Sequence, residues 1–202
     1  MHVAYISLGG NLPSPAGPPD VTLAAAVGRL ANDGRVTACS SLYSTAPVGF
    51  ADQPRFLNSI LALETSLSPL ELLGAVLTIE RDFGRDRLNA IPDGPRTLDL
   101  DIALYGDFVL TQAALEIPHA RLAERAFVLV PLNEIAPDLR DPRSGRTVSE
   151  LLQALHSTLS PSAAHAMDAV VQIESDSWRA AVGGHVAGGS AGAGAISHPD
   201  HG

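Results

Sequence analysis

The chain has 202 residues, of which 46% are hydrophobic, so one packed domain of ordinary size with a tail is expected. Its net charge of −9 argues against broad binding to nucleic acids or anionic membranes. No apolar run approaches the ~20 residues of a membrane span, and no basic stretch precedes an apolar one at the N-terminus, so we expect a cytoplasmic protein. The single cysteine, Cys39, excludes an internal disulfide and indicates a buried thiol.

Runs of apolar and β-branched residues predict strands at 3–8, 36–43, 56–64 and 98–104, and a turn at 105–108 leads into a short edge strand at 108–110. The first strand ends in Gly9-Gly10-Asn11-Leu12. A structural turn is favoured there over a phosphate cradle, because no further glycine motif follows.

Apolar residues at helical spacing predict four helices: between Asp20 and Gly34, between Ser68 and Gly84, from His119 to Pro131, and over 147–155. The second begins with the capping box Ser68-Pro69-Leu70-Glu71. Pro131 is expected to end or kink the third helix.

The mixed order of strands and helices predicts an α+β fold, specifically a ferredoxin-like two-layer α/β sandwich with an extra hairpin strand and C-terminal helices. We assign this domain to residues 1–160. Residues 161–178 form an extension of uncertain structure with one possible strand at 170–173. Residues 179–202 are rich in Gly, Ala, Ser and His, and we expect them to be disordered.

All 13 cationic side chains are arginine, and the chain has no lysine. This excludes a Walker-type phosphate loop and a Schiff-base lysine. Phosphate would have to be held by arginine, histidine, backbone amides or metal. Six arginines lie between residues 81 and 125, which favours a local polyanion site, with scattered surface arginines as the alternative.

The stretch Gly94-Pro95-Arg96-Thr97-Leu98-Asp99-Leu100-Asp101-Ile102 is the strongest candidate for chemistry. On a strand, Asp99 and Asp101 face one side, whereas Leu98, Leu100, Ile102 and Leu104 face the other. Two carboxylates at this spacing suit one or two Mg²⁺ ions. Arg96 can hold a phosphate bidentately. A solvated pair of acids on a half-exposed strand is the alternative interpretation.

Two further groups are candidates for binding. Phe56 and Asn58 share a strand face, where an aromatic ring and an amide suit a flat heterocycle. His119 and the arginines that follow it lie near a helix start and can face an anion. The alternative interpretation of Phe56 and Asn58 is a core side chain and a solvent-facing amide. The alternative for His119 is a capping or core histidine.

The motifs, in this order, resemble those of the 6-hydroxymethyl-7,8-dihydropterin pyrophosphokinase family over roughly residues 3 to 140. The matching segments are Ser7–Leu12, Asp52-Gln53-Pro54 with Phe56-Leu57-Asn58, Gly84-Arg85, Gly94–Asp101, and Ile117-Pro118-His119 with Arg125 and Phe127. The resemblance implies transfer of pyrophosphate from ATP to the pterin hydroxymethyl group in folate biosynthesis, releasing AMP.

The resemblance also implies a role for each matching residue. Asp99 and Asp101 would bind two Mg²⁺ ions, and Arg85 and Arg96 would act with them in catalysis. The ATP site would comprise Glu80, Arg87, Arg96, Ile102, His119 and Arg125. The pterin site would comprise Ala46, Val48, Phe56, Asn58 and Phe127. The implied partners are these two small substrates, without nucleic acid or membrane, and the implied state is a monomer.

Three positions depart from the family pattern: Asp93 replaces an aromatic residue, Ala120 replaces a tyrosine, and Gly10 replaces serine or alanine. The alternative function is a non-catalytic ferredoxin-like module that binds RNA or a nucleotide. Such sheets stack bases on exposed aromatic residues. Only 4% of this chain is aromatic and its net charge is negative, which argues against that alternative.

Overall fold

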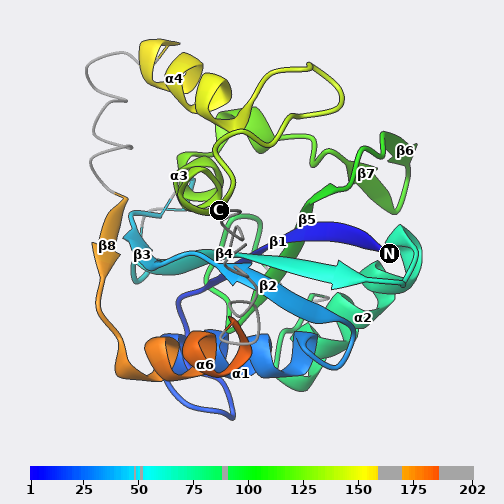
Figure 1. Ribbon diagram of the computed structural model, residues 1–202. Helices are drawn as coiled ribbons and strands as arrows, with labels where there is room; N and C mark the ends of the chain where they lie inside the picture. Colours follow the sequence, from blue (N-terminus) through cyan, green and yellow to red (C-terminus); the bar gives the residue numbers. More distant parts are fainter. Residues whose placement is uncertain (48, 51, 88–90, 159–169, 187–202) are drawn as a thin grey trace, which may run out of the picture.

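The computed structural model describes residues 1–47, 49–50, 52–87, 91–158 and 170–186. A six-stranded antiparallel sheet lies at its centre, with helices on both faces (Figure 1). The order of strands is β5-β1-β4-β3-β8, and β2 also pairs with β4. The strands are β1 (His2–Gly10), β2 (Arg35–Cys39), β3 (Leu42–Thr45), β4 (Phe56–Thr65), β5 (Asp99–Tyr105) and β8 (Val171–Ile173).

Helices form a layer on each side of this sheet (Figure 1). One layer contains α1 (Pro19–Leu30), α2 (Pro69–Asp82) and α6 (Asp176–Val186), and the other contains α3 (Ala126–Ile135) and α4 (Val148–Thr158). The short helix η1 (Leu122–Glu124) precedes α3, and β6 (Leu110–Gln112) pairs with β7 (Leu115–Ile117) in a separate hairpin. The sheet therefore lies between two layers of helices, one layer more than the expected two-layer sandwich contains.

Each layer has its own hydrophobic core. Ile6 and Leu8 of β1 pack with Leu23 of α1 and Val76 of α2, all fully buried or nearly so. On the other face, Leu104 packs with Leu129 of α3 and its neighbours. The capping box predicted at Ser68 is confirmed: Ser68 Oγ accepts the Glu71 amide, and the Glu71 carboxylate accepts the Ser68 amide.

A β-bulge changes the predicted alternation of β5. Tyr5 pairs with Leu104 and Ile6 with Ile102, so Ala103 is an extra residue without a partner on β1. Beyond this point the side chains change face, and Leu104 packs beside α3 instead of beside Leu100. The prediction that Leu104 shares a face with Leu100 is therefore wrong, because strict alternation holds only while the register is continuous.

Three other predicted elements differ from the structure. The strand expected at 36–43 is divided at Ser40-Ser41 into β2 and β3. The edge strand expected at 108–110 begins only at Leu110 and pairs within its own hairpin. The third helix, expected from His119, begins with η1 at Leu122 and continues as α3 from Ala126. Pro131 lies inside α3, which continues to Ile135, so the expected end at Pro131 is wrong. A proline removes a single helical N–H, and the buried side chains of this helix hold it in place.

The C-terminal segment is more ordered than its composition suggests. Residues 170–173 do contain a strand, β8, which pairs with β3. The disorder expected from Arg179 onward is wrong for residues 179–186, which belong to α6; residues 187–202 lie outside the described residues. Helix α6 is anchored by Trp178, whose side chain is 5% exposed. Among the described helices, none is long and apolar enough to cross a membrane.

Candidate active site

The two aspartates of β5 lie on the same strand face, as predicted. Asp99 is opposite Gly9 and Asp101 is opposite Ser7 on β1. Their side chains are 18% and 35% exposed, whereas Leu100 and Ile102 are buried in the core on the other face. The strand, which lies at one edge of the sheet, therefore presents two accessible carboxylates on one face.

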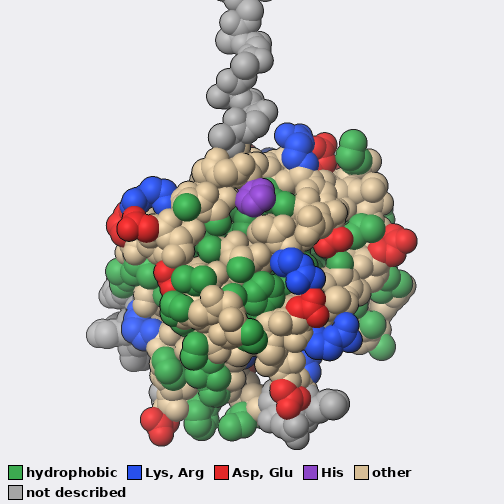
Figure 2. Space-filling view, turned by 90° about the horizontal axis from the view of Figure 1, so that it is seen from below, with side chains coloured by type: hydrophobic (Ala, Val, Ile, Leu, Met, Phe, Trp, Pro, Cys, Tyr) green, Lys and Arg blue, Asp and Glu red, His purple; other side chains and the backbone are tan. Residues whose placement is uncertain are grey.

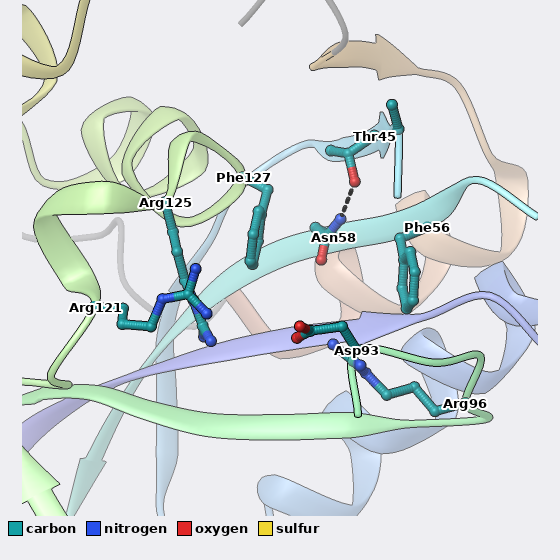
Figure 3. A pocket seen from close by; sticks show the side chains of 9 residues that line it. Thr45, Phe56, Asn58, Asp93, Arg96, Arg121, Arg125 and Phe127 are labelled. Atoms are coloured by element: carbon teal, nitrogen blue, oxygen red, sulfur yellow. Dashed lines mark hydrogen bonds between the residues drawn. The ribbon is translucent and has the colours of Figure 1, made fainter. Parts of the chain in front are cut away.

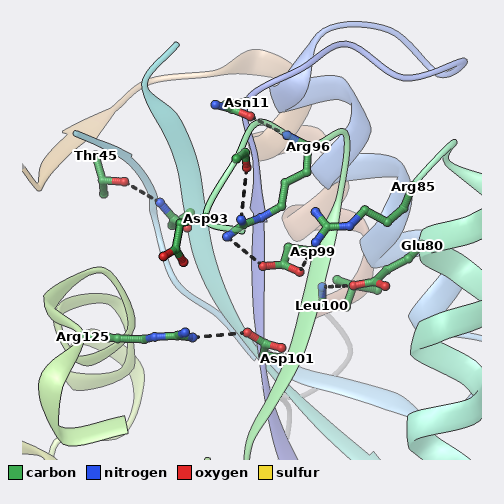
Figure 4. A network of polar contacts seen from close by, with 12 residues as sticks. Asn11, Thr45, Glu80, Arg85, Asp93, Arg96, Asp99, Leu100, Asp101 and Arg125 are labelled. Atoms are coloured by element: carbon green, nitrogen blue, oxygen red, sulfur yellow. Dashed lines mark hydrogen bonds and ion pairs between the residues drawn. The ribbon is translucent and has the colours of Figure 1, made fainter. Parts of the chain in front are cut away.

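Arginines surround the first carboxylate. Nη2 of Arg96 lies 2.9 Å from Oδ2 of Asp99, and Nη2 of Arg85 lies 3.4 Å from Oδ1 (Figure 4). Arg87 is farther away, at 4.0 Å. Burial lowers the pKa of Arg85 from its usual value, but a guanidinium remains charged at neutral pH. The cations therefore exceed the charge of Asp99, which leaves the site able to attract a polyanion.

Several arginine nitrogens beside Asp99 have no hydrogen-bond partner among the residues that the structure describes. Nε and Nη1 of Arg85 and Nε of Arg96 are buried without a hydrogen-bond acceptor, and Oγ1 of Thr97 is buried without any partner. Buried donors are normally satisfied, so unpaired ones at a site require an explanation. Phosphate oxygens would satisfy these donors.

Glu80 lies behind this cluster and organises it. Its side chain is 1% exposed; it accepts the Leu100 amide at 2.8 Å and receives two hydrogen bonds from Arg87, at 2.7 and 2.8 Å. Burial raises the pKa of Glu80, although the Leu100 amide and Arg87 oppose this effect. Since its oxygens are engaged inside the protein, Glu80 positions Arg87 and β5, and the prediction that it contacts ATP directly is not favoured.

The second carboxylate has a different neighbourhood. Nη1 of Arg125 lies 3.4 Å from Oδ2 of Asp101, and Nε2 of His119 lies 4.0 Å from the same oxygen. Arg125 also lies 3.5 Å from His119. Burial lowers the pKa of His119, so the ring is neutral at pH 7 and can accept or donate a hydrogen bond.

Asn11 connects the parts of the site, a role that the sequence interpretation missed. Its Oδ1 accepts the Arg96 amide at 2.8 Å, while its Nδ2 donates to Oε1 of Gln53 at 3.1 Å and to the Pro54 carbonyl at 2.9 Å. The turn predicted at Gly9-Gly10 is wrong, because both glycines belong to β1; a Cβ at Gly10 would lie 2.5 Å from the Thr97 carbonyl oxygen, so the close approach of the two backbones requires glycine there.

A pocket lined by aromatic residues lies next to the carboxylates. Phe56 of β4 and Phe127 of α3 face each other across it, with the Asn58 amide between them (Figure 3). Nδ2 of Asn58 donates to Oγ1 of Thr45 at 2.7 Å, which fixes the orientation of this amide. The Arg96 guanidinium lies 4.8 Å from the centroid of the Phe56 ring, so the pocket opens toward the Asp99 cluster.

Comparison with known proteins decides the family. The model of the family 7,8-dihydro-6-hydroxymethylpterin-pyrophosphokinase (HPPK) matches residues 5–137. This chain belongs to the HPPK family. It is thus an ATP-dependent diphosphotransferase that transfers pyrophosphate from ATP to 6-hydroxymethyl-7,8-dihydropterin in folate biosynthesis, as the sequence resemblance implied.

Individual relatives agree. A 2-amino-4-hydroxy-6-hydroxymethyldihydropteridine pyrophosphokinase of Synechocystis sp. is 47% identical over 159 residues, which cover 78% of each chain. One of Pseudomonas aeruginosa is 48% identical over 150 residues, which cover 74% of this chain and 90% of that one. Among solved structures, a triple mutant of Plasmodium falciparum HPPK-DHPS matches with a TM-score of 0.67 at 16% identity. That match covers 86% of this chain but 47% of the other, and it concerns the fold alone.

The structure brings most of the predicted HPPK site residues together. Ala46, Phe56, Asn58 and Phe127 line the aromatic pocket, whereas Val48 lies outside the described residues. The side chain of Ile102 is buried in the core on the face opposite Asp101, so only its backbone could face ATP. Sequence reasoning gave no binding role to Thr45 and Asp93, which also line the pocket, and Arg121, expected to face an anion, lines it as well.

Proposed function

We propose that this HPPK performs its reaction in the space between the aromatic pocket and the two aspartates of β5. The observation that carries this proposal is the adjacency of the two sites: Arg96 lines the aromatic pocket and also contacts Asp99. A flat ring held between Phe56 and Phe127 would have its substituent close to phosphates held over β5.

We assign Asp99 and Asp101 to magnesium. Carboxylate oxygens suit this hard cation, which keeps several sites for water and phosphate oxygens. No group of three or more His, Cys, Asp and Glu residues able to hold a metal occurs in the described parts of the chain, so substrate oxygens and water would complete the coordination. Two ions are proposed, and when bound they would neutralise the triphosphate and orient it.

The arginines are proposed to hold the group that is transferred. Arg85 and Arg96 have buried nitrogens without acceptors beside Asp99, so they can bind phosphate oxygens while their other nitrogens keep Asp99 in place. Arg87, Arg125 and His119 are proposed to contact ATP, with the Ile102 backbone, and Glu80 to support Arg87. These fixed charges stabilise the transition state without reorganisation.

The proposed reaction is an in-line displacement. The hydroxymethyl oxygen of the pterin forms a bond to the β-phosphorus of ATP, the bond from that phosphorus to the oxygen bridging to the α-phosphorus breaks, and AMP leaves with that oxygen. The hydroxyl proton is released to solvent. The protein supplies alignment and charge neutralisation, which are the main requirements of phosphoryl transfer.

The pterin ring is proposed to stack between Phe56 and Phe127. Oδ1 of Asn58, whose amide nitrogen is already bonded to Thr45, remains available to accept an N–H of the ring. The backbone of Ala46 and Val48 would read the remaining edge. A pocket with two aromatic walls and one oriented amide suits a flat, polar heterocycle.

We further propose a ferredoxin-like arrangement for the part of the fold that ends with β5. The order β5-β1-β4 followed by β2 and β3, with α1 and α2 on one face, supports it. A domain over residues 1–160, a monomeric state and a cytoplasmic location remain proposals.

The alternative of an RNA-binding module is not favoured, because the chain belongs to the HPPK family. On the one face seen in Figure 2, which carries α1 and α6, acidic and basic side chains are interspersed. RNA binding needs clustered positive charge.

The product of the reaction tests the proposed function. Protein, ATP, Mg²⁺ and the reduced hydroxymethylpterin are mixed, and the nucleotides are separated. We expect AMP to form only when the pterin is present. Formation of ADP, or of no new nucleotide, would contradict the proposal.

A further inference from the structure

We propose that the C-terminal segment from β8 to α6 (residues 171–186) is a brace that sets the geometry of the pterin pocket; this rests on the proposed function. The segment lies beyond residues 5–137, which match the HPPK family. It contacts the sheet at the Ser40-Ser41 break between β2 and β3, where both helical layers meet.

The helical layer of α3 and α4 contacts the break through Glu134, near the end of α3. Its carboxylate accepts the Ser41 amide at 3.0 and 2.9 Å, the Ser41 hydroxyl at 2.8 Å and the Tyr43 hydroxyl at 2.9 Å. Burial and the contact with Glu134 raise the pKa of Tyr43 to about 12, so this tyrosine remains a donor. Glu134 thus ties α3 to β3 with charge-assisted hydrogen bonds.

The helical layer of α1, α2 and α6 contacts the same break through Trp178 of α6. Its Nε1 donates to the Ser40 carbonyl at 3.1 Å in a fully buried contact, and the ring belongs to the core beneath the sheet. From β8, Nε2 of Gln172 donates to Oγ of Ser41 at 3.1 Å. The Ser40-Ser41 break is therefore held by α3 from one face of the sheet and by β8 and α6 from the other face and the edge (Figure 1).

These contacts bear on the pocket because its walls belong to the elements that they join. Phe127 is the second residue of α3, and Thr45, which orients Asn58, is the last residue of β3. Phe56 projects from the opposite wall on β4 (Figure 3). The separation and tilt of the two aromatic walls depend on how α3 and β3 are fixed to the sheet. Small displacements in a binding site have large kinetic effects.

The brace is tested by steady-state kinetics on four variants of the full chain. Trp178→Ala removes the contact of α6 with Ser40. Glu134→Gln weakens the contact of α3 with Ser41. Arg179→Ala changes an exposed side chain next to Trp178 on the same helix. Leu72→Ala removes a buried side chain near the start of α2, away from the pocket, and is the control for lost stability.

For Trp178→Ala and Glu134→Gln we expect the KM for the pterin to rise about tenfold, with the KM for ATP changed by less than about threefold. ATP is affected less because Arg125 is the one proposed ATP ligand adjoining α3. Arg179→Ala and Leu72→Ala should leave both KM values within about twofold. Assays are run well below the melting temperature of each variant.

The brace is refuted if Trp178→Ala raises the pterin KM no more than Leu72→Ala does, or raises both KM values equally; Glu134→Gln tests only the contact between α3 and the break. If Trp178→Ala fails to fold, Trp178→Phe replaces it with the same expected change, because it keeps an aromatic ring in the core and removes the hydrogen bond to the Ser40 carbonyl. Absence of AMP formation by the unaltered protein would instead refute the proposed function, so the two failures are distinguishable.

Discussion

Arg96 connects the aromatic pocket with the carboxylate of Asp99. It pairs with Asp99, lies 4.8 Å from the Phe56 ring centroid and is held at its backbone by Asn11. We expect Arg96→Lys to lower kcat by about 10²-fold or more, because one ammonium cannot pair with Asp99 and hold a phosphate bidentately. Measured kcat, with Arg29→Lys on the exposed surface as control, checks this. Retention of most of the rate would contradict the role given to Arg96.

Cys39 offers a test that is independent of catalysis. Cys39 is only partly buried, less than the sequence predicts, and this burial raises the pKa of its thiol to about 12, from an ordinary value near 9.0. The thiolate is the reactive form, so alkylation by iodoacetamide at pH 8 should be about 10³-fold slower in the folded protein than in urea. Equal rates in the two states, measured by mass spectrometry, would show that the fold does not suppress ionisation of this thiol.

For single residues, the sequence predicted the orientation of those side chains that depends on local strand geometry. Asp99 and Asp101 face one way because alternation along a strand requires it. Asn11 was missed because its partners, Gln53 and Arg96, are 42 and 85 residues away in the chain. No local pattern contains such contacts; only the register of the sheet brings them together.

The capping box of α2 makes a prediction at the scale of one element. Ser68→Ala removes the acceptor for the Glu71 amide and should lower the free energy of unfolding by about 1 kcal/mol. The kcat should not change, because Ser68 lies at the end of α2 remote from Glu80. Urea unfolding measures the effect, with exposed Ser66→Ala as control. Equal stability of the two variants would contradict it.

Helices and strands could be predicted where apolar residues recur at regular spacing. They were predicted less well where contacts with other elements interrupt this spacing. The break at Ser40-Ser41 carries no local signal, because side chains from other elements hold it. The bulge at Ala103 is visible only in the pairing of β5 with β1. Helix α6 has a weakly apolar sequence, and it is held by the burial of Trp178, which composition does not reveal. Packing decided these features.

At the scale of the molecule, the fold should not depend on magnesium. Asp99 is already paired with Arg96 and Arg85, and Asp101 with Arg125, so neither carboxylate is an unpaired buried charge without metal. We expect EDTA to abolish turnover and to change the melting temperature by less than about 2 °C. A large fall in melting temperature would indicate a structural metal site instead.

The most direct test of the account is a crystal structure with Mg²⁺ and a non-hydrolysable ATP analogue. Carboxylate oxygens of both Asp99 and Asp101 are predicted to lie at the ~2.0–2.1 Å typical of magnesium ligands, with Arg85 and Arg96 on phosphate oxygens. The account is contradicted if both carboxylates keep only their arginine partners and the cations bind elsewhere.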